Sequence, residues 1–207
     1  MSNNIGQKSD KREGNAVKKI GVFGGAFNPP HKGHVALAKG MADSLGLDEV
    51  LIIPSYISPH KSSSSLAGGE HRLAMCRLAF GDDPRFTVSS MELDRGGKSY
   101  TVETLREIKK NNPDAALYLI VGSDMFLSFN TWRCYEEILQ LATLCAASRK
   151  QGLHLAENPY KALIVDLPVL EMSSTDLRKK LAEGGNVEEF VGKKVAQYMK
   201  SEGLYRD

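Results

Sequence analysis

Two hydrophobic patterns alternate along almost the whole chain. Short runs of β-branched and other apolar residues are typical of strands buried on both faces, whereas longer segments with apolar residues every three or four positions predict helices. The predicted strands span residues 18–23, 48–54, 85–89, 116–122, 143–148 and 162–166. The predicted helices span residues 33–45, 70–80, 101–111, 173–183 and 187–200, with a short helical pair around Phe126 and from Trp132 to Leu141. The first of them is expected to end at Gly46, and Thr101 is expected to be the N-cap of the third.

This alternation predicts an α/β fold with a doubly wound, mainly parallel sheet and a small C-terminal helical part. The first two strands and the helix between them should form a parallel βαβ unit with a right-handed crossover. In such a fold the ligand crevice lies at the carboxyl ends of the strands. A chain of 207 residues, 42% of them hydrophobic, is long enough for one domain with a sizeable core.

The first 17 residues differ from the remainder in composition. They are mostly polar and charged and contain no apolar stretch of the kind found in a signal peptide. We therefore expect residues 1–17 to be a disordered extension and residues 18–207 to form the single domain.

Charge and cysteine content exclude several classes of protein. The formal net charge is only +2, from 27 Lys and Arg against 25 Asp and Glu, so no broad basic surface is expected to bind nucleic acid. No apolar run approaches the roughly 18 residues that span a membrane. Cys76, Cys134 and Cys145 are far apart and form no C-x-x-C pair, which predicts neither a zinc site nor a disulfide framework. We expect a reduced, cytoplasmic protein, and homo-oligomerisation is left open.

The stretch between the first strand and the first helix has the features of a phosphate-binding turn. Gly24 and Gly25 are expected to let the backbone approach a ligand and to permit positive φ, while the helix that follows directs free N–H groups at an anion. His31 and His34 lie three residues apart and are expected to share a face, where both can donate to the same phosphate. A surface turn with two incidental histidines is the alternative, and it would be favoured for either histidine alone.

Spacing excludes two common phosphate motifs. The pattern G-x-x-x-x-G-K-[ST] fails because Glu92 stands where the first glycine before Gly97, Lys98 and Ser99 would have to be. The dinucleotide pattern G-x-G-x-x-G is absent, because Gly21, Gly24 and Gly25 have other offsets.

A second candidate phosphate site precedes the predicted helix at residues 173–183. Ser173 and Asp176 have the spacing of a capping box, and taken alone the sequence S-S-T-D is most simply a well-capped helix. However, the hydroxyl groups of Ser173, Ser174 and Thr175, with Arg178 one turn further on, would also make a good seat for a polyphosphate.

Both stretches resemble motifs of one known family. The first reads G-G-x-F-x-P-x-H-x-G-H from Gly24 to His34 and closely resembles the N-terminal signature of the H-x-G-H nucleotidyltransferases, in the form found in nicotinate mononucleotide adenylyltransferases. The second, M-S-S-T-D-L-R at residues 172–178, resembles the family's I-S-[ST]-T-x-[IL]-R. The resemblance covers residues 18–205 and implies a Rossmann-like nucleotidyltransferase fold. It implies catalytic roles for His31, His34 and Arg178, and ATP binding by Gly24, Gly25, Phe27, Ser173, Ser174 and Thr175.

Further matches imply where the mononucleotide binds. The segment S-Y-T-V-E-T-L at residues 99–105 resembles the family's S-Y-T-x-x-T-L, whose backbone N–H groups hold the pyridine carboxylate, and it implicates Tyr100 and Thr101. Asp124 falls in a G-x-D match whose aspartate serves ribose hydroxyls. Trp132 matches the position whose ring stacks on the pyridinium, where without the resemblance it would be interpreted as a core or interface aromatic. Lys61, in S-P-H-K at residues 58–61, suits the mononucleotide phosphate.

The resemblance implies a specific reaction. The adenylyl group of ATP would be transferred to nicotinate mononucleotide, forming nicotinate adenine dinucleotide and pyrophosphate in NAD biosynthesis. Mg²⁺ would accompany ATP, bound through phosphate and water rather than by a protein metal site. Two alternatives stay open, namely an adenylyl- or cytidylyltransferase of the same fold with another phosphate acceptor, and a non-catalytic nucleotide-sensing module. The matches at residues 99–105 and Trp132 disfavour the first, and the completeness of both phosphate motifs disfavours the second.

Overall fold

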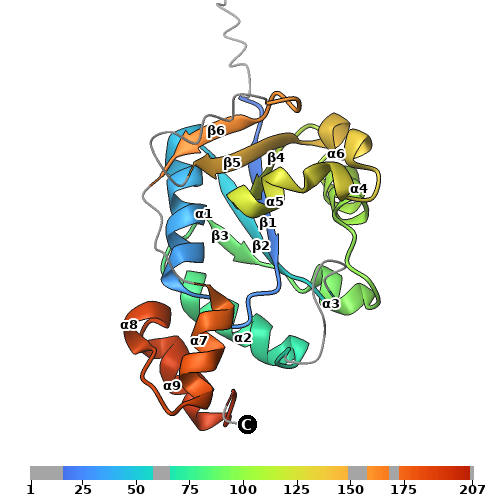
Figure 1. Ribbon diagram of the computed structural model, residues 1–207. Helices are drawn as coiled ribbons and strands as arrows, with labels where there is room; N and C mark the ends of the chain where they lie inside the picture. The colour runs from blue at the N-terminus through green and yellow to red at the C-terminus, as the bar shows by residue number, and fades with distance from the viewer. Residues whose placement is uncertain (1–15, 58–65, 149–157, 168–172, 206–207) are drawn as a thin grey trace, which may run out of the picture.

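One six-stranded parallel sheet forms the centre of the protein (Figure 1). A computed structural model describes residues 16–57, 66–148, 158–167 and 173–205. The strand order is β3-β2-β1-β4-β5-β6, and every neighbouring pair is parallel, which confirms the predicted doubly wound α/β fold. The strands are β1 (Lys19–Gly25), β2 (Glu49–Pro54), β3 (Phe86–Val88), β4 (Ala116–Val121), β5 (Thr143–Ser148) and β6 (Leu163–Asp166).

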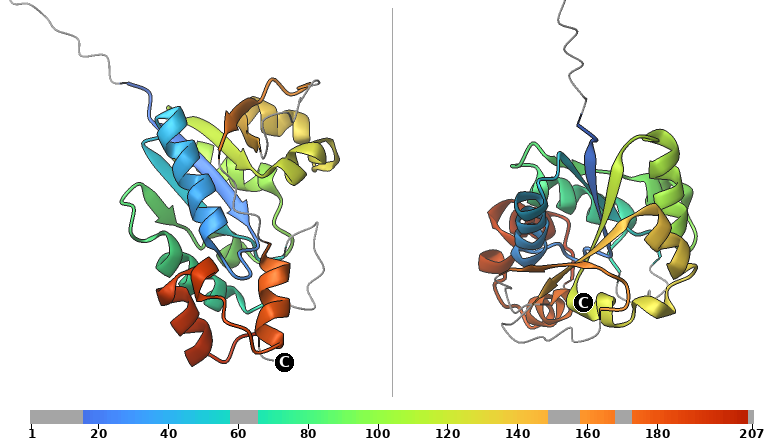
Figure 2. Two further views of the ribbon diagram at one scale, coloured as in Figure 1. Left: turned by 60° about the vertical axis from the view of Figure 1, so that its left-hand side comes forward. Right: turned by 90° about the horizontal axis from the view of Figure 1, so that it is seen from above.

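Helices cover both faces of this sheet (Figures 1 and 2). Helices α1 and α2 pack on one face, α4, α5 and α6 pack on the other, and α7 to α9 form a separate group beside α2. The helices are α1 (Lys32–Leu45), α2 (Gly69–Phe80), α3 (Met91–Arg95), α4 (Thr101–Asn111), α5 (Ser123–Leu127), the 3₁₀ turn η1 (Phe129–Thr131), α6 (Tyr135–Leu141), α7 (Ser174–Ala182), α8 (Glu188–Val191) and α9 (Lys193–Ser201).

The side chains of β4 explain why its sequence is an almost unbroken apolar run. Leu117, Leu119 and Val121 point into the core under α4 and α6, whereas Ile120 points into the core under α1 and α2. Because successive side chains of a strand face opposite sides of a sheet, a strand covered on both faces needs apolar residues at nearly every position.

Helix α1 begins and ends near the residues that the sequence predicts. Ala38, Met41 and Ala42 are buried against the sheet, and Gly46 follows the last turn with φ 60°. Glycine adopts this left-handed conformation without the steric cost of a Cβ, which is why it terminates the helix.

Three sequence predictions about helices are wrong in detail. The segment predicted as one helix over residues 187–200 is divided into α8 and α9, because Gly192 has φ 84° and interrupts the helical backbone. Helix α4 has Tyr100 rather than Thr101 as its N-cap. Trp132 ends the η1 turn in an extended conformation, so the helix predicted from Trp132 begins only at Tyr135. Helix α3 has only five residues, which is too short for a hydrophobic periodicity to reveal it in the sequence.

The C-terminal helices attach to the sheet domain through α2. Their shared core consists of Met75, Leu177, Val187, Val191, Val195 and Met199, all buried. Cys76 and Cys145 are buried, as expected for core residues, and all three cysteines are free thiols. Within the described residues, no helix is both long enough and apolar enough to cross a membrane.

Some predictions concern residues outside the described ranges. The expected extension lies almost wholly in residues 1–15, and Lys61 lies in residues 58–65. Both therefore stay predictions.

The strand order places a crevice at one defined point of the sheet. The chain runs outwards from β1 through β2 to β3 and then returns to the other side of β1 at β4. The helix that follows β1 packs on one face of the sheet, and the helix that follows β4 packs on the other face. A doubly wound sheet binds ligands between the carboxyl ends of two such strands.

We expect Gly21→Ala to lower the free energy of unfolding by about 1–3 kcal/mol, because the added methyl group overpacks the core between the sheet and helices α1 and α2. A Cβ at Gly21 would lie 2.8 Å from Leu47 Cδ1 and 3.2 Å from both Ile120 Cδ1 and Val50 Cγ2, and all three side chains are buried. Urea unfolding measures the difference. Gly24→Ala is the matched control on the same strand, because its Cβ would meet nothing closer than Ile53 O at 4.0 Å. Equal destabilisation by the two substitutions would contradict this account of β1.

Candidate active site

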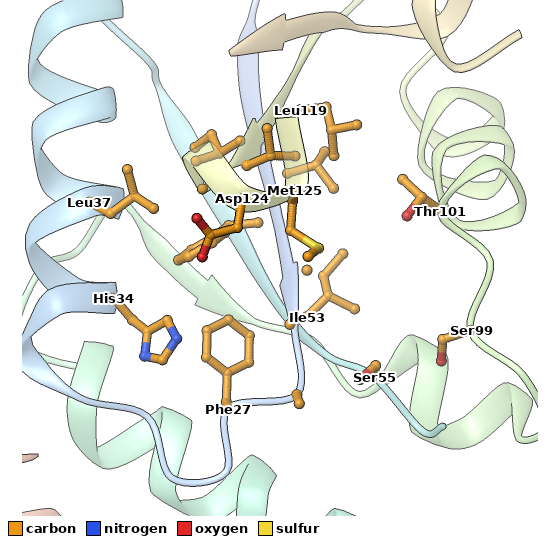
Figure 3. A pocket seen from close by; sticks show the side chains of 18 of the residues that line it. Phe27, His34, Leu37, Ile53, Ser55, Ser99, Thr101, Leu119, Asp124 and Met125 are labelled. Carbon is orange, nitrogen blue, oxygen red and sulfur yellow. The ribbon is translucent and has the colours of Figure 1, made fainter. Parts of the chain in front are cut away.

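A cavity of about 1090 Å³ lies where the strand order predicts it, at the carboxyl ends of β1 and β4. Figure 3 shows Phe27 and His34 on one side of this cavity and Ser99 and Thr101 on the other, with Asp124 and Met125 between them. Among the described residues, every position predicted to bind ATP or mononucleotide lines this cavity. The structure therefore brings together residues from opposite ends of the sequence.

The loop between β1 and α1 differs from its prediction in one respect. Neither Gly24 nor Gly25 has a positive φ, because both residues continue β1, and the left-handed conformation falls instead on Phe27 with φ 46°. That conformation is strained in a bulky residue, and the burial of the Phe27 ring, 2% exposed between Phe23 and Phe80, holds it in place. Gly25 is needed for another reason, since a Cβ there would lie 3.2 Å from the Phe27 ring.

The rings of the two histidines lie against each other at the start of α1, with their planes inclined by 34°. Their ring centroids are 3.7 Å apart, and His31 is the N-cap residue. The backbone N–H of His31 donates to Nδ1 of His34 over 3.2 Å. A neutral His34 ring whose Nδ1 accepts a hydrogen bond carries its proton on Nε2, so we assign Nε2–H of His34 as a donor.

The second motif binds the backbone of the first. Ser174 Oγ donates to the carbonyl of Pro29 over 2.9 Å, and Arg178 Nη1 donates to the carbonyl of Asn28 over 2.8 Å. Both residues line the cavity, so the start of α7 and the start of α1 face the same space. Two helix N-termini directed at one space favour an anion there.

Ser173 caps α7 as the sequence predicts. Its Oγ accepts a hydrogen bond from the backbone N–H of Asp176 over 3.2 Å and donates to the Asp176 carboxylate over 2.6 Å. The hydrogen bond from Ser173 holds the pKa of Asp176 below its ordinary value. The cap thus fixes where α7 begins and which of its hydroxyl groups face the cavity.

Asn28 and Tyr205 support the first motif and were missed by the sequence analysis. Asn28 Oδ1 accepts hydrogen bonds from Tyr205 Oη over 2.7 Å and from the backbone N–H of Ala67 over 3.0 Å. Burial raises the pKa of Tyr205 well above its ordinary range, so its hydroxyl remains a donor. Nothing in the sequence near residue 205 identifies this partner, because the contact joins positions 177 residues apart.

The other side of the cavity carries the residues predicted for the mononucleotide. Tyr100 and Thr101 lie at the start of α4, and Trp132 packs beside Phe129 with its ring half-buried and lining the cavity. Arg133, which the sequence analysis did not identify, places its guanidinium 4.6 Å from the centroid of the Tyr100 ring. The cavity is therefore bordered here by aromatic rings and by the cations of Arg133 and Lys98.

A buried carboxylate fixes the start of α4. Thr104 Oγ1 donates to Glu92 Oε1 over 2.6 Å, Ser99 also donates a side-chain hydrogen bond to Glu92, and Arg95 lies nearby. Burial raises the pKa of Glu92, while the hydrogen bonds from Thr104 and Ser99 oppose that rise. Glu92 belongs to α3, the helix that periodicity did not detect.

Arg72 is the largest fully buried side chain near the site, with 2% of its surface exposed. It lies on the buried face of α2 with Met75, Cys76 and Phe80, three, four and eight positions further on. An arginine on the apolar stripe of a predicted helix was a signal available in the sequence, because charged residues are almost never fully buried without partners.

Comparisons with known proteins agree with this geometry. Residues 22–180 match the family model described as "Cytidylyltransferase-like". The chain is 36% identical over 189 residues to the nicotinate-nucleotide adenylyltransferase of Bacillus subtilis, covering 91% of this chain and 99% of the relative. It is 42% identical over 188 residues to a Thermus thermophilus protein named "Probable nicotinate-nucleotide adenylyltransferase", covering 91% of this chain and 100% of the relative.

Solved structures show the same fold. The nicotinic acid mononucleotide adenylyltransferase of Plasmodium falciparum, solved as a complex with NaAD, has a TM-score of 0.76 at 18% identity. The alignment covers 91% of this chain and 97% of that chain.

The buried Glu92 should make stability fall as pH rises. A raised folded-state pKa means that the folded protein binds this proton more tightly than the unfolded chain, so the stabilisation is complete below the unfolded pKa, about 4.3 for Glu, and is lost through the raised pKa. Glu92→Gln removes this titration. We expect the free energy of unfolding of the variant, relative to wild type, to increase from pH 4 upwards and then level off, as measured by urea unfolding at each pH.

Glu183→Gln, at the exposed C-cap position of α7, is the control for the loss of one negative charge, since Glu183 is not among the groups that act on Glu92. A difference between Glu92→Gln and wild type that decreases with rising pH would show that the ionised carboxylate is stabilised by its neighbours rather than opposed by burial.

Proposed function

The chain belongs to the nicotinate-nucleotide adenylyltransferase family, and on that premise we propose that it transfers the adenylyl group of ATP to nicotinate mononucleotide in NAD biosynthesis. The products are nicotinate adenine dinucleotide and pyrophosphate. The observation that carries this proposal is the junction of the two phosphate motifs, where Arg178 and Ser174 of α7 bind the loop that leads into α1. This junction supports the binding of a polyphosphate at one border of the cavity, whose volume of about 1090 Å³ leaves room for a second substrate.

The reaction needs positioning and charge stabilisation more than acid–base chemistry. A phosphate oxygen of the mononucleotide attacks the α-phosphorus of ATP, a new P–O bond forms, and the bond between the α-phosphorus and the bridging oxygen breaks. Pyrophosphate leaves with the bonding electrons. The nucleophile is already an anion, so no base has to remove a proton, and rate is gained by alignment and by donors at the oxygens where charge develops.

We assign to the two histidines and Arg178 the stabilisation of the charge that develops on these phosphate oxygens. Nε2–H of His34 is oriented by the hydrogen bond at Nδ1, and the centroid of the His31 ring lies 3.7 Å from that of the His34 ring. The Arg178 guanidinium has five N–H groups, and Nη1 donates to the Asn28 carbonyl. The guanidinium can therefore also donate to phosphate oxygens in the cavity that it lines. Ser173, Ser174 and Thr175 at the start of α7 serve the β- and γ-phosphates, and Gly24, Gly25 and Phe27 border the nucleotide.

The opposite border suits the mononucleotide. Tyr100 and Thr101 stand at the N-terminus of α4, whose backbone N–H groups favour the pyridine carboxylate. The half-buried Trp132 ring can stack on the cationic pyridinium, an interaction of about 0.5–2 kcal/mol. Asp124 lines the cavity between the two borders, where a ribose hydroxyl would lie, and Lys61 remains assigned to the mononucleotide phosphate.

Mg²⁺ fits this site as a companion of ATP. Within the described residues, no group of three or more His, Cys, Asp and Glu side chains could hold a metal ion. Mg²⁺ is commonly held through substrate phosphates and water, and in that form it would neutralise part of the triphosphate charge. The protein's own contribution is then the donor set of His31, His34 and Arg178.

The cellular setting is part of the proposal. Three free cysteines suit the reducing cytoplasm, where disulfides are rare. Small-molecule substrates account for the cavity, and we propose no nucleic-acid or membrane partner.

Pyrophosphate release in the presence of ATP and a panel of acceptors tests the function. We expect the highest kcat/KM with nicotinate mononucleotide, because only this substrate offers both a pyridinium for Trp132 and a carboxylate for the start of α4. Nicotinamide mononucleotide, phosphopantetheine and glycerol 3-phosphate are the comparison substrates.

Preferred turnover of phosphopantetheine or glycerol 3-phosphate would identify a different transferase of this fold. Binding of ATP without turnover of any acceptor would identify a nucleotide sensor.

A further inference from the structure

A single buried guanidinium holds four backbone carbonyls beneath the cavity. Arg72 Nε donates to Ala67 O over 2.9 Å, Nη1 donates to Ala26 O over 3.0 Å and to Ser55 O over 2.6 Å, and Nη2 donates to Tyr56 O over 3.3 Å. No carboxylate of the described residues pairs with this cation. Within the described part of the chain, the hydrogen bonds of Arg72 are therefore all with main-chain carbonyls.

Three of these carbonyls follow two different strand ends, and the fourth, of Ala67, precedes α2. Ala26 follows β1 and begins the loop that carries Phe27 and leads to His31, whereas Ser55 and Tyr56 follow β2. The ladder between the two strands ends where Ser55 N–H donates to Gly25 O over 2.9 Å. Immediately beyond that bond, Arg72 Nη1 joins the two segments by donating to Ala26 O and to Ser55 O.

The end of β2 is in turn bound to the start of α4. The backbone N–H of Tyr56 donates to Ser99 Oγ over 2.9 Å, and the backbone N–H of Ser99 donates to Ile57 O over 3.0 Å. Ser99 is 8% exposed and immediately precedes Tyr100 and Thr101. A chain of hydrogen bonds thus runs from the ATP side of the cavity, through Arg72 and Tyr56, to the mononucleotide side.

We propose that Arg72 is a positioning residue that sets the distance between the two substrate sites, and so aligns the attacking phosphate with the α-phosphorus. This inference rests on the proposed function for the assignment of the two sides. Each side has its own further support, because Arg178, Ser174 and Tyr205 hold Asn28 and Pro29, while Glu92 holds Ser99 and Thr104. Loss of Arg72 should therefore leave each substrate bound and disturb how the two meet.

The rate of an in-line transfer is sensitive to such a disturbance. A displacement of about 1 Å between reacting groups can cost about 100-fold in rate. Arg72→Met removes both the charge and the four hydrogen bonds. Arg72→Lys keeps the charge but replaces the planar fork with one ammonium of three donors, which cannot reach four carbonyls. The two variants therefore separate charge from geometry.

The test measures kcat, the KM of each substrate and the stoichiometry of ATP binding by calorimetry. We expect Arg72→Met to lower kcat by about 100-fold and Arg72→Lys by about tenfold, with each KM changed by less than about threefold and one ATP bound per chain. Full stoichiometry excludes an unfolded fraction as the cause. Arg77→Met, at an exposed position of the same helix, is the matched control and should keep wild-type values.

Amide hydrogen exchange gives a second readout that does not need turnover. Arg72→Met and Arg72→Lys should speed exchange in residues 24–31 and 54–57 together, and Arg77→Met should not. If the wild type turns over no acceptor, the proposed function fails, while the exchange result still decides whether Arg72 joins the two segments. If Arg72→Met does not fold, Arg72→Lys decides alone.

Wild-type kcat in Arg72→Lys, or in a folded Arg72→Met, would overturn the proposal. So would a loss of kcat that is no larger than the loss of ATP-binding stoichiometry.

Discussion

The structure depends on the loop of residues 26–31, whose backbone carbonyls are held by side chains from distant parts of the chain. Three of these carbonyls accept bonds from side-chain donors, namely Ala26 from Arg72, Asn28 from Arg178 and Pro29 from Ser174. A buried carbonyl that loses its partner costs about 1–3 kcal/mol, so each donor is strongly required. The loop cannot be described apart from α2 and α7, which supply its partners.

This arrangement explains how a parallel sheet becomes a site for two substrates. The strand order opens a crevice beside β1 and β4, but it does not by itself place any functional group there. The loop places the His31 and His34 pair at one border, and its partners bring the start of α7 to the same place. Glu92 and Ser99 fix the start of α4 at the other border. The starts of α1 and α7 thus face the start of α4 across one cavity.

The sequence predicts local and motif-level features well and tertiary partners poorly. The apolar run of β4, the end of α1 at Gly46 and the Ser173 cap each follow from the chemistry of a few neighbouring residues, and the structure confirms them. Arg72 and Tyr205 act on carbonyl and amide groups far away in the sequence, and backbone acceptors have no sequence signature. Gly24 and Gly25 show a related limit, because a glycine can serve close packing, here against the Phe27 ring, as readily as positive φ.

The central claim is that His34 stabilises charge at the reacting phosphate, and the kcat of His34 variants tests it most directly. His34→Ala should lower kcat by about 100- to 1,000-fold, as for the loss of a preorganised donor to a developing oxyanion. His34→Asn can still accept from the His31 N–H but lacks Nε2–H, so it should retain the wild-type unfolding free energy and still lose kcat. A folded His34→Ala enzyme with wild-type kcat would contradict the account.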